Sequence, residues 1–281
     1  MNFQTLFSNP IIVSILLRAF ITGVLVSLCA SMLGVSLVLK RYSMIGDGLS
    51  HVGFGALAVA TVLDLNEFSL EITLPIVIAT AYLLLRMSKR GKMSGDAAIA
   101  VISTGAVAIG SLIYNFTGSR SSDICGSLFG SSSIITLTDK DLLLSIILSG
   151  AVLLLFILFY NRIFAITFDE TFAMATGIKT ELYNMLIAGM CAVTIVLGMK
   201  LMGALMISAL VIFPSLTAMR ICRSFKSTVI CSAIISVICF VIGLFLASIL
   251  SFQTGPVVVT IHLFVFSAVS FFRSRAAKIS A

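Results

Sequence analysis

Long apolar runs alternate with short clusters of charged residues along the whole chain. The runs at 19–39, 97–119, 142–161, 182–199 and 201–219 contain no Asp, Glu, Lys or Arg. An α-helix rises about 1.5 Å per residue, so about 20 apolar residues cross the hydrocarbon core of a bilayer. The pattern therefore predicts a series of membrane-spanning helices.

Three further stretches complete the predicted set of helices. The runs at 48–63 and 72–85 are shorter, and they span a bilayer if the charged side chains beside them reach towards the interface. The uncharged run 227–272 is long enough for two helices, and "SFQTGP" (Ser251 to Pro256) supplies Gly-Pro turn chemistry that divides it. We expect a polytopic all-α bundle of nine transmembrane helices, with eight as the alternative, in one domain covering residues 1–281.

Composition excludes a water-soluble globule, because 59% of the residues are hydrophobic and only 10% are charged. Nine helices place all but four of the 18 Lys and Arg residues on one set of loops, the exceptions being Arg18, Arg120, Lys140 and Lys200. Short cytoplasmic loops are enriched in Lys and Arg, so this distribution predicts an external N-terminus. The net charge of +7 then reflects topology, and it does not indicate nucleic-acid binding because the cations are spread over many short loops.

Two loops are long enough to be more than connections. Residues 115–141 are rich in Ser and Gly, and they are expected outside the membrane as a surface loop or a short re-entrant helix. Residues 162–181 are expected in the cytoplasm. Their stretch "FDETFAMATGI" starts with acidic residues, which favour a helix N-terminus, and reaches Gly177, a natural helix stop. It predicts a short amphipathic cytoplasmic helix.

The six cysteines form no CxxC pair, and all but one fall within or at the ends of predicted helices. We therefore expect neither a zinc finger nor a disulfide framework. The positions are Cys29, Cys125, Cys191, Cys222, Cys231 and Cys239.

An acid and an imidazole interrupt the second predicted helix. Asp47 and His51 are four residues apart, which leaves them about 40° apart on one helical face. If the helix starts near Tyr42 at the cytoplasmic surface, they lie about 8 Å and about 14 Å along it, within a core about 30 Å thick. Ionisable groups at that depth face a cavity or a partner and indicate an ion or proton pathway.

A carboxylate and an imidazole together suit divalent transition metals such as Zn²⁺ and Mn²⁺, whereas Mg²⁺ and Ca²⁺ prefer oxygen ligands alone. The pair Asp47 and His51 is half of a tetrahedral site, and a symmetric homodimer would complete it with a second pair. The alternative is a buried hydrogen-bonded pair that only ties helices together. The other histidine, His262, stands alone in the last predicted helix, and we interpret it as a hydrogen-bonded packing residue.

Three stretches resemble the membrane permeases of zinc and manganese ABC importers. "RYSMIGDGLSH" (Arg41 to His51) is similar to the most specific motif of that family. "FDETFAMATGI" (Phe168 to Ile178) resembles its cytoplasmic coupling segment, and "MGALMISALVIFPSLTA" (Met202 to Ala218) resembles a late helix that contains a proline. The resemblance covers nearly the whole chain.

The resemblance implies a homodimer, or a pair with a homologous permease, that works with two cytoplasmic ATP-binding subunits and an extracytoplasmic metal-binding protein. It also implies a fold similar to the cobalamin-importer type. By the same resemblance, Asp47 and His51 are ligands of the metal pathway. The residues it assigns to docking on the ATPase are Asp169, Glu170, Ala173 and Gly177.

The resemblance therefore leads us to expect a permease of the bacterial cytoplasmic membrane that imports Zn²⁺ or Mn²⁺, with Fe²⁺ as a further candidate, and that holds no prosthetic group. The sequence contains no GxxxxGK[ST] phosphate loop, so we expect no enzymatic activity here and ATP hydrolysis on a separate subunit. The alternative is a proton-coupled secondary cation transporter, which would need a pH gradient instead of ATP. An intramembrane metalloprotease is disfavoured because the sequence has no HExxH motif.

Overall fold

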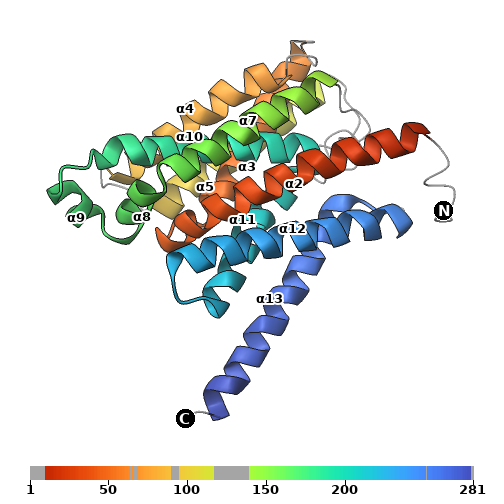
Figure 1. Ribbon diagram of the computed structural model, residues 1–281. Helices are drawn as coiled ribbons and strands as arrows, with labels where there is room; N and C mark the ends of the chain where they lie inside the picture. The colour runs from red at the N-terminus through yellow and green to blue at the C-terminus, as the bar shows by residue number, and fades with distance from the viewer. Residues whose placement is uncertain are drawn as a thin grey trace.

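A computed structural model describes residues 10–63, 65, 69–89, 95–116, 139–250 and 252–279, and in them the chain forms a helical bundle without an assigned strand (Figure 1). The long helices are α2 (Pro10–Leu39), α3 (Ile45–Val62), α4 (Ser69–Lys89), α5 (Gly95–Phe116), α7 (Asp139–Leu158), α10 (Thr180–Met202), α11 (Ala204–Ile221), α12 (Phe225–Leu250) and α13 (Thr254–Ile279). Two short helices, α8 (Tyr160–Phe168) and α9 (Glu170–Ala175), connect α7 to α10.

Within the described residues, eight helices are long and apolar enough to cross a membrane. The remaining long helix, α11, is shorter in its apolar part, Met206–Ile221, and it packs against α2, α3, α10, α12 and α13. This agrees with the expected eight to nine helices. Nearly all of the 115–141 loop lies outside the described residues, as does Cys125.

Two breaks divide the long apolar runs of the second half. Gly203 separates α10 from α11 with a φ of +88°, a backbone conformation that glycine adopts without strain. The division of the last run falls at Phe252 and Gln253, slightly before the predicted Gly-Pro pair. Pro256 instead occupies the first turn of α13, where a missing backbone N–H leaves no helical hydrogen bond unmade.

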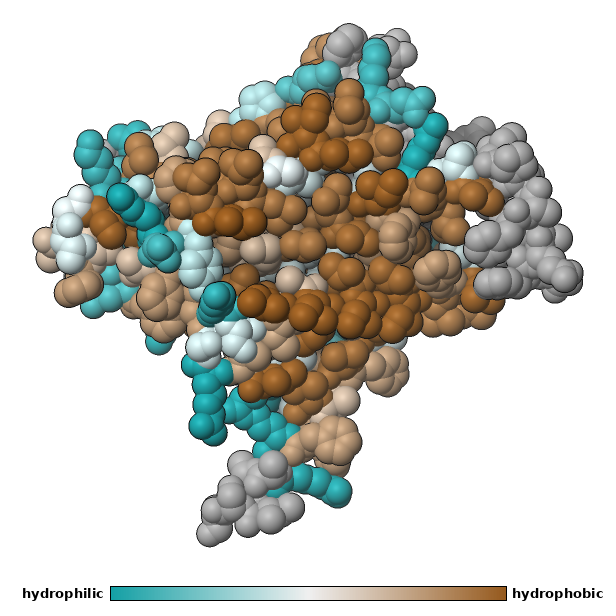
Figure 2. Space-filling model, in the orientation of Figure 1, coloured by the Kyte–Doolittle hydropathy of each residue, from teal (hydrophilic) through white to brown (hydrophobic). Residues whose placement is uncertain are grey.

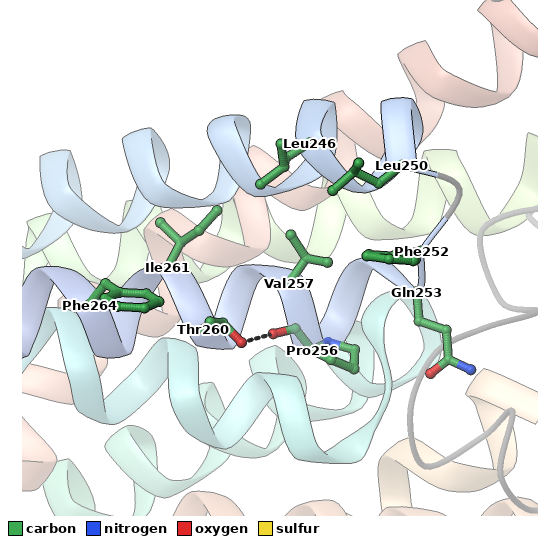
Figure 3. Close-up of a pocket in the computed structure, with 9 residues that line it drawn as sticks. All are labelled: Leu246, Leu250, Phe252, Gln253, Pro256, Val257, Thr260, Ile261 and Phe264. Atoms are coloured by element: carbon green, nitrogen blue, oxygen red, sulfur yellow. Dashed lines mark hydrogen bonds between the residues drawn. The ribbon is translucent and has the colours of Figure 1, made fainter. Parts of the chain in front are cut away.

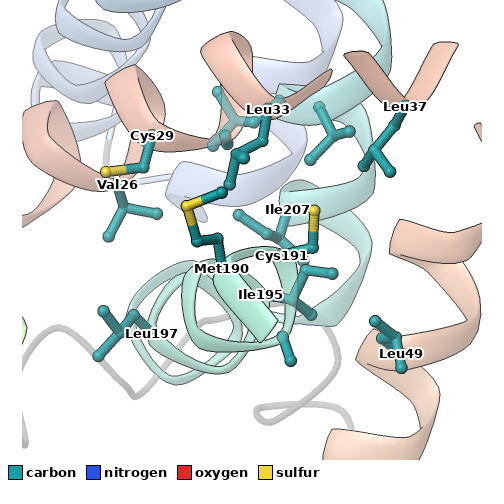
Figure 4. Packing of buried hydrophobic residues seen from close by; sticks show 14 of the residues in the cluster. Val26, Cys29, Leu33, Leu37, Leu49, Met190, Cys191, Ile195, Leu197 and Ile207 are labelled. Atoms are coloured by element: carbon teal, nitrogen blue, oxygen red, sulfur yellow. The ribbon is translucent and has the colours of Figure 1, made fainter. Parts of the chain in front are cut away.

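The core lies where α2, α10 and α11 meet, and Figure 4 shows Leu33 of α2 and Ile207 of α11 directed towards Met190 and Cys191 of α10. Buried hydroxyls join the helices beside this core, because Ser215 of α11 and Ser232 of α12 both lie within hydrogen-bonding distance of the Ser31 carbonyl of α2. Polar links between helices are expected in lipid, which supplies no hydrophobic drive for helix association.

Apolar side chains cover most of the face shown in Figure 2, and hydrophilic ones gather near α9 and at the C-terminal end of α13. At the opposite end of the bundle, two ion pairs hold α7. The Arg18 guanidinium of α2 lies 2.7 Å from the Asp139 carboxylate, and Lys200 of α10 lies 2.8 Å from Asp141. The first turn of α7 is therefore tied to both α2 and α10.

Candidate metal site

A tight turn between α2 and α3 positions the candidate ligands. The Tyr42 N–H donates to the Leu37 carbonyl and the Arg41 N–H to the Val38 carbonyl, the pair of bonds that defines a Schellman helix end. Arg41 occupies the position where glycine is usual, with a φ of +62°. The chain then reverses direction and α3 begins at Ile45.

Asp47 and His51 face one another on α3. The His51 Nε2 atom lies 3.6 Å from Asp47 Oδ2, and the side chains are 23% and 36% exposed, respectively. Most of the other residues of α3 are buried, so this pair occupies an accessible stripe on a helix that is otherwise packed. The sequence prediction that the two residues share a face is confirmed.

A third polar side chain reaches the pair from α11. The Ser208 hydroxyl lies 3.3 Å from Asp47 Oδ1, on the carboxylate oxygen that does not face His51. The other imidazole nitrogen, His51 Nδ1, is buried and has no hydrogen-bond partner in the part of the chain that the structure describes. A buried donor or acceptor without a partner carries a free-energy penalty, which a bound ligand or a neighbouring subunit can relieve.

Glycines let α3 pack closely against its neighbours. A Cβ atom on Gly48 would meet Ile99 Cγ2 at 2.6 Å, and one on Gly55 would meet the Ala106 carbonyl oxygen at 2.9 Å. On the other side, a Cβ on Gly34 of α2 would lie 2.1 Å from the Val211 carbonyl oxygen of α11. Small residues thus fix how α3 lies against α5, and how α2 lies against the helix that carries Ser208.

The separation between His51 Nε2 and Asp47 Oδ2 is longer than a direct hydrogen bond and is compatible with an ion held between them. Two atoms that each lie about 2.1 Å from a tetrahedral ion are about 3.4 Å apart, whereas a hydrogen bond brings nitrogen and oxygen to about 2.7–3.2 Å. The observed 3.6 Å is closer to the first value. Among the described residues there is no group of three or more His, Cys, Asp or Glu side chains that could hold a metal ion, so within one chain Asp47 and His51 would fill only two positions of a tetrahedral shell.

The segment between α7 and α10 consists of the short helices α8 and α9. Asp169 lies between them and caps the N-terminus of α9. The Asp169 carboxylate accepts hydrogen bonds from the backbone N–H groups of Thr171 and Phe172, at 3.0 and 2.9 Å. The hydrogen bond from the Thr171 hydroxyl lowers the pKa of Asp169 below its ordinary value, because it stabilises the charged carboxylate. The bond from the Phe172 N–H acts in the same direction and more weakly. Gly177 ends the segment with a φ of +83°, as the sequence predicted for a helix stop.

Two of the four residues expected to dock on an ATPase face the bundle instead of its outer surface. Ala173 is buried against Ile166 and Tyr183. The Glu170 carboxylate accepts a hydrogen bond of 2.9 Å from the side-chain Nδ2 of Asn184 in α10. The side-chain Oδ1 of Asn184 accepts one from the Lys40 ammonium. Lys40 is the last residue before the turn that leads to α3, so this network connects α9 to the helix that carries Asp47.

Three large apolar side chains are exposed on this segment, beside the polar side chains of Asp169 and Thr171. Phe168, Phe172 and Met174 are exposed around α9, at the end of the bundle that also holds the turn after α2 (Figure 1). Sequence reasoning did not single out these three side chains, nor Ser208, Lys40 and Asn184. The available signal for Phe168 and Phe172 was that they flank the acidic residues Asp169 and Glu170 in the sequence.

His262 differs from His51 in its burial and in its partner, although each histidine has one buried ring nitrogen without a hydrogen-bond partner among the described residues. Its side chain is 1% exposed, and its Nδ1 atom lies 2.9 Å from the Val258 carbonyl one turn earlier in α13. This agrees with the interpretation of His262 as a hydrogen-bonded packing residue.

A groove of about 610 Å³ lies between the end of α12 and the start of α13. Figure 3 shows Leu250, Val257 and Ile261 among the side chains that line it. Its surface is mostly hydrocarbon and offers no carboxylate, imidazole or thiol, so it does not suit a metal ion.

Comparisons with known proteins identify relatives over nearly the full chain. The ABC 3 transport family matches residues 13–273. The high-affinity zinc uptake system membrane protein ZnuB of Haemophilus influenzae is 29% identical over 263 residues, covering 93% of this chain and 98% of that protein. The manganese import system permease protein ScaB of Streptococcus gordonii is 27% identical over 255 residues, covering 91% and 90%. The fold is similar to that of PsaBC from Streptococcus pneumoniae, with a TM-score of 0.84 at 24% identity over 99% of this chain and 98% of the other.

Proposed function

The chain belongs to the ABC 3 transport family, and we propose that it is the membrane permease of an ATP-driven importer whose cargo, a divalent transition-metal ion, is bound by Asp47 and His51 on its way through. The chain is a multi-pass integral protein of the bacterial plasma membrane. Zn²⁺ and Mn²⁺ are the expected cargo because relatives over nearly the full length are named for zinc and manganese uptake, and Fe²⁺ suits the same ligands.

The observation that carries this proposal is the pair itself. An acid and an imidazole within a membrane helix, 3.6 Å apart and partly accessible, replace part of the hydration that a metal ion loses on entering the bilayer. The Ser208 hydroxyl orients one carboxylate oxygen, as hydrogen bonds to ligating carboxylates do. A second permease, identical or homologous, would supply the remaining ligands from its own copy of α3.

Energy for transport would come from a separate pair of ATP-binding subunits that dock on the exposed surface of Phe168, Phe172 and Met174. Movement of α9 would reach the metal pair through Glu170, Asn184 and Lys40, because Lys40 immediately precedes the turn into α3. An extracytoplasmic metal-binding protein would deliver the ion to the other end of the bundle. The permease itself would catalyse no covalent change.

The test is uptake of radiolabelled Zn²⁺, Mn²⁺ and Fe²⁺ into proteoliposomes that contain the permease, its ATPase and its binding protein. Asp47→Ala and His51→Ala should abolish ATP-dependent uptake of the cargo ion, while His262→Gln serves as a matched control on a buried imidazole. Uptake by both variants at the wild-type rate would refute the assignment of the pair. Uptake driven by a pH gradient without ATP would refute the ABC mechanism.

Coupling is tested separately with Phe172→Ala and Glu170→Gln. Phe172→Ala should weaken ATPase binding to the permease in a pull-down. Glu170→Gln should leave the ATPase bound but lower the uptake achieved per ATP hydrolysed, because the link from α9 to Lys40 is weakened. Normal ratios of transport to hydrolysis in Glu170→Gln would remove Glu170 from the proposed path.

A further inference from the structure

The final part of the chain carries only positive charge. Residues 182–281 contain no Asp or Glu, whereas they hold seven Lys and Arg residues. Lys200 is paired with Asp141. The other six lie in or beside the turn between α11 and α12 or near the end of α13, and the distribution of Lys and Arg assigns this end of the bundle to the cytoplasm. They are Arg220, Arg223, Lys226, Arg273, Arg275 and Lys278.

Two arginines hold the end of α11 beside α13. The Arg220 guanidinium donates a hydrogen bond of 2.7 Å to the Ser270 hydroxyl, and the Arg273 guanidinium donates one of 3.5 Å to the Met219 carbonyl. Both acceptors are neutral, so these bonds leave the positive charges in place. Figure 2 shows hydrophilic side chains gathered at this end of α13. The ends of α11 and α13 therefore contribute to one cationic surface.

A surface groove of about 540 Å³ lies at the start of α12, directly after α11. Lys226, Ser224 and Ser227 line its polar part, and Ile230 and Ile234 line much of its apolar part. None of the residues that line the groove is acidic. The groove therefore offers an ammonium group and two hydroxyls in its polar part and hydrocarbon in the rest.

The apolar part continues along α12 as a ridge of isoleucines. Ile230, Ile234, Ile238 and Ile242 follow Lys226 at intervals of four residues, the spacing that forms a ridge on a helix surface. All four isoleucines are between 51% and 54% exposed. Because α12 is long and apolar enough to cross a membrane, the ridge runs from the cationic surface into the hydrocarbon core. Ile234 lies about 12 Å along the helix from Lys226.

We propose that this groove binds an anionic phospholipid of the cytoplasmic leaflet, with its phosphate at Lys226 and one acyl chain along Ile230 and Ile234. Phosphate oxygens accept charge-assisted hydrogen bonds from an ammonium group, and the neighbouring serine hydroxyls can donate further ones. Basic segments directly beside a membrane span attract anionic lipids of that leaflet. A soluble phosphate would occupy the polar part alone, whereas a phospholipid covers both parts.

The two sides of this turn would then be held by different contacts. On the buried side, the centre of the Phe225 ring lies 5.2 Å from that of Phe164 and 6.0 Å from that of Phe168, both in α8. On the exposed side, Lys226 lies in the first turn of α12, which contains no acidic residue. The positive end of the helix dipole disfavours a cation there, and a bound phosphate offsets both charges. Lipid binding should therefore raise the melting temperature of the permease.

The experiment titrates the purified full-length permease in detergent with phosphatidylglycerol or phosphatidylcholine and counts bound lipids by native mass spectrometry. Wild type should bind phosphatidylglycerol several-fold more tightly than phosphatidylcholine. Lys226→Gln should weaken phosphatidylglycerol binding about five-fold, the effect of one cation at a membrane surface. The matched control is Lys179→Gln, which removes an exposed lysine beside α9 and outside the groove, and it should bind like wild type.

A second pair of variants tests the acyl-chain contact. Ile234→Asn should also weaken phosphatidylglycerol binding several-fold, whereas Ile249→Asn, near the other end of α12 and equally free of the groove lining, should not. Melting temperatures in phosphatidylcholine show whether each variant is folded. Lys226 is exposed, so Lys226→Gln should fold and carries the test even if Ile234→Asn does not.

Three results would overturn the proposal. The first is equal affinity of wild type for the two lipids, or equal binding of phosphatidylglycerol by Lys226→Gln and Lys179→Gln. The second is displacement of the lipid by inorganic phosphate together with unchanged binding in Ile234→Asn, which would indicate a site for a soluble anion. The third is loss of the bound lipid when the ATPase joins the permease, which would mean that a protein covers the groove.

Discussion

The regions around the two histidines differ in what each imidazole can reach. His51 is partly accessible, faces the carboxylate of Asp47 and shares it with a hydroxyl from α11. His262 is fully buried, and within the described part of the chain its imidazole is hydrogen-bonded only to the Val258 carbonyl of its own helix. A histidine buried within a membrane helix is therefore a poor indicator of a metal site. The informative feature is a second ionisable side chain on the same accessible stripe.

The largest expected effect separates the two histidines directly. His51→Leu should lower uptake by more than about 100-fold, because loss of a direct ligand exceeds the 10–100-fold typical of a lost outer-shell partner. His262→Leu should leave uptake unchanged and alter the free energy of unfolding by less than about 1 kcal/mol. It loses the hydrogen bond between Nδ1 and the Val258 carbonyl, but it also removes Nε2, a buried nitrogen without a partner among the described residues. Radiolabelled uptake and thermal unfolding followed by circular dichroism measure both. Loss of uptake in His262→Leu would show that transport needs both histidines and would contradict the proposed difference between them.

The second prediction concerns the helix contact that supports the His51 region. A Cβ on Gly34 would lie 2.1 Å from a backbone oxygen of α11, which cannot rotate away. Gly34→Ala should destabilise the protein by about 1–3 kcal/mol or more, as overpacking does. The control is Gly189→Ala in α10, where no described atom outside the local helix lies within 4 Å of the added Cβ, and it should stabilise the protein by up to about 1 kcal/mol. Equal melting temperatures for the two variants would show that α2 and α11 are not held this closely.

A third pair compares close packing beside each histidine. Gly48→Ala would push against Ile99 Cγ2 and displace α3, so it should weaken metal binding a few-fold, and adding Ile99→Ala should restore it. Gly243→Ala would meet Val258 at 2.3 Å, one turn before His262, and should lower the melting temperature without changing metal affinity. Isothermal titration with the cargo ion distinguishes the two outcomes. Weaker metal binding in Gly243→Ala would mean that the His262 region also shapes the site.

The smallest effect is expected at Ser208. Ser208→Ala removes one hydrogen bond of 3.3 Å to Asp47, so the binding free energy of the ion should weaken by about 0.5–1.5 kcal/mol. Ser236→Ala, which removes a buried hydroxyl bonded to the Ser27 carbonyl, should cost stability but leave affinity unchanged. An unchanged affinity in Ser208→Ala would limit the site to Asp47 and His51.

Charge spacing was enough to predict most of the bundle, since each uncharged run became one helix and the last run became two. The start of α2 was missed because Arg18 interrupts the apolar pattern, although an arginine near a helix end can pair with a neighbouring carboxylate, as it does with Asp139. The α10–α11 break falls at Gly203 because a single glycine can take the positive φ required there.

The candidate site was only partly predictable, because a four-residue spacing identifies side chains on one helix and nothing more. Ser208 is one of many serines in apolar helices, and only tertiary packing brings it to Asp47. The coupling segment shows the same limit. Motif resemblance selected four residues of this segment. Asp169 and Gly177 are exposed, packing against α10 directs Glu170 and Ala173 inward, and tertiary structure adds Phe172 and Met174 to the exposed surface.

The two ion pairs that hold α7 respond differently to dissolved salt. Asp139 is 82% exposed, so mobile ions can screen its attraction to Arg18, whereas Asp141 is 12% exposed and its pairing with Lys200 is shielded from them. As ionic strength rises, the Arg18–Asp139 ion pair between α2 and α7 should weaken before the Lys200–Asp141 ion pair between α7 and α10. In concentrated salt the start of α7 would then separate from α2 while Lys200 still holds it to α10.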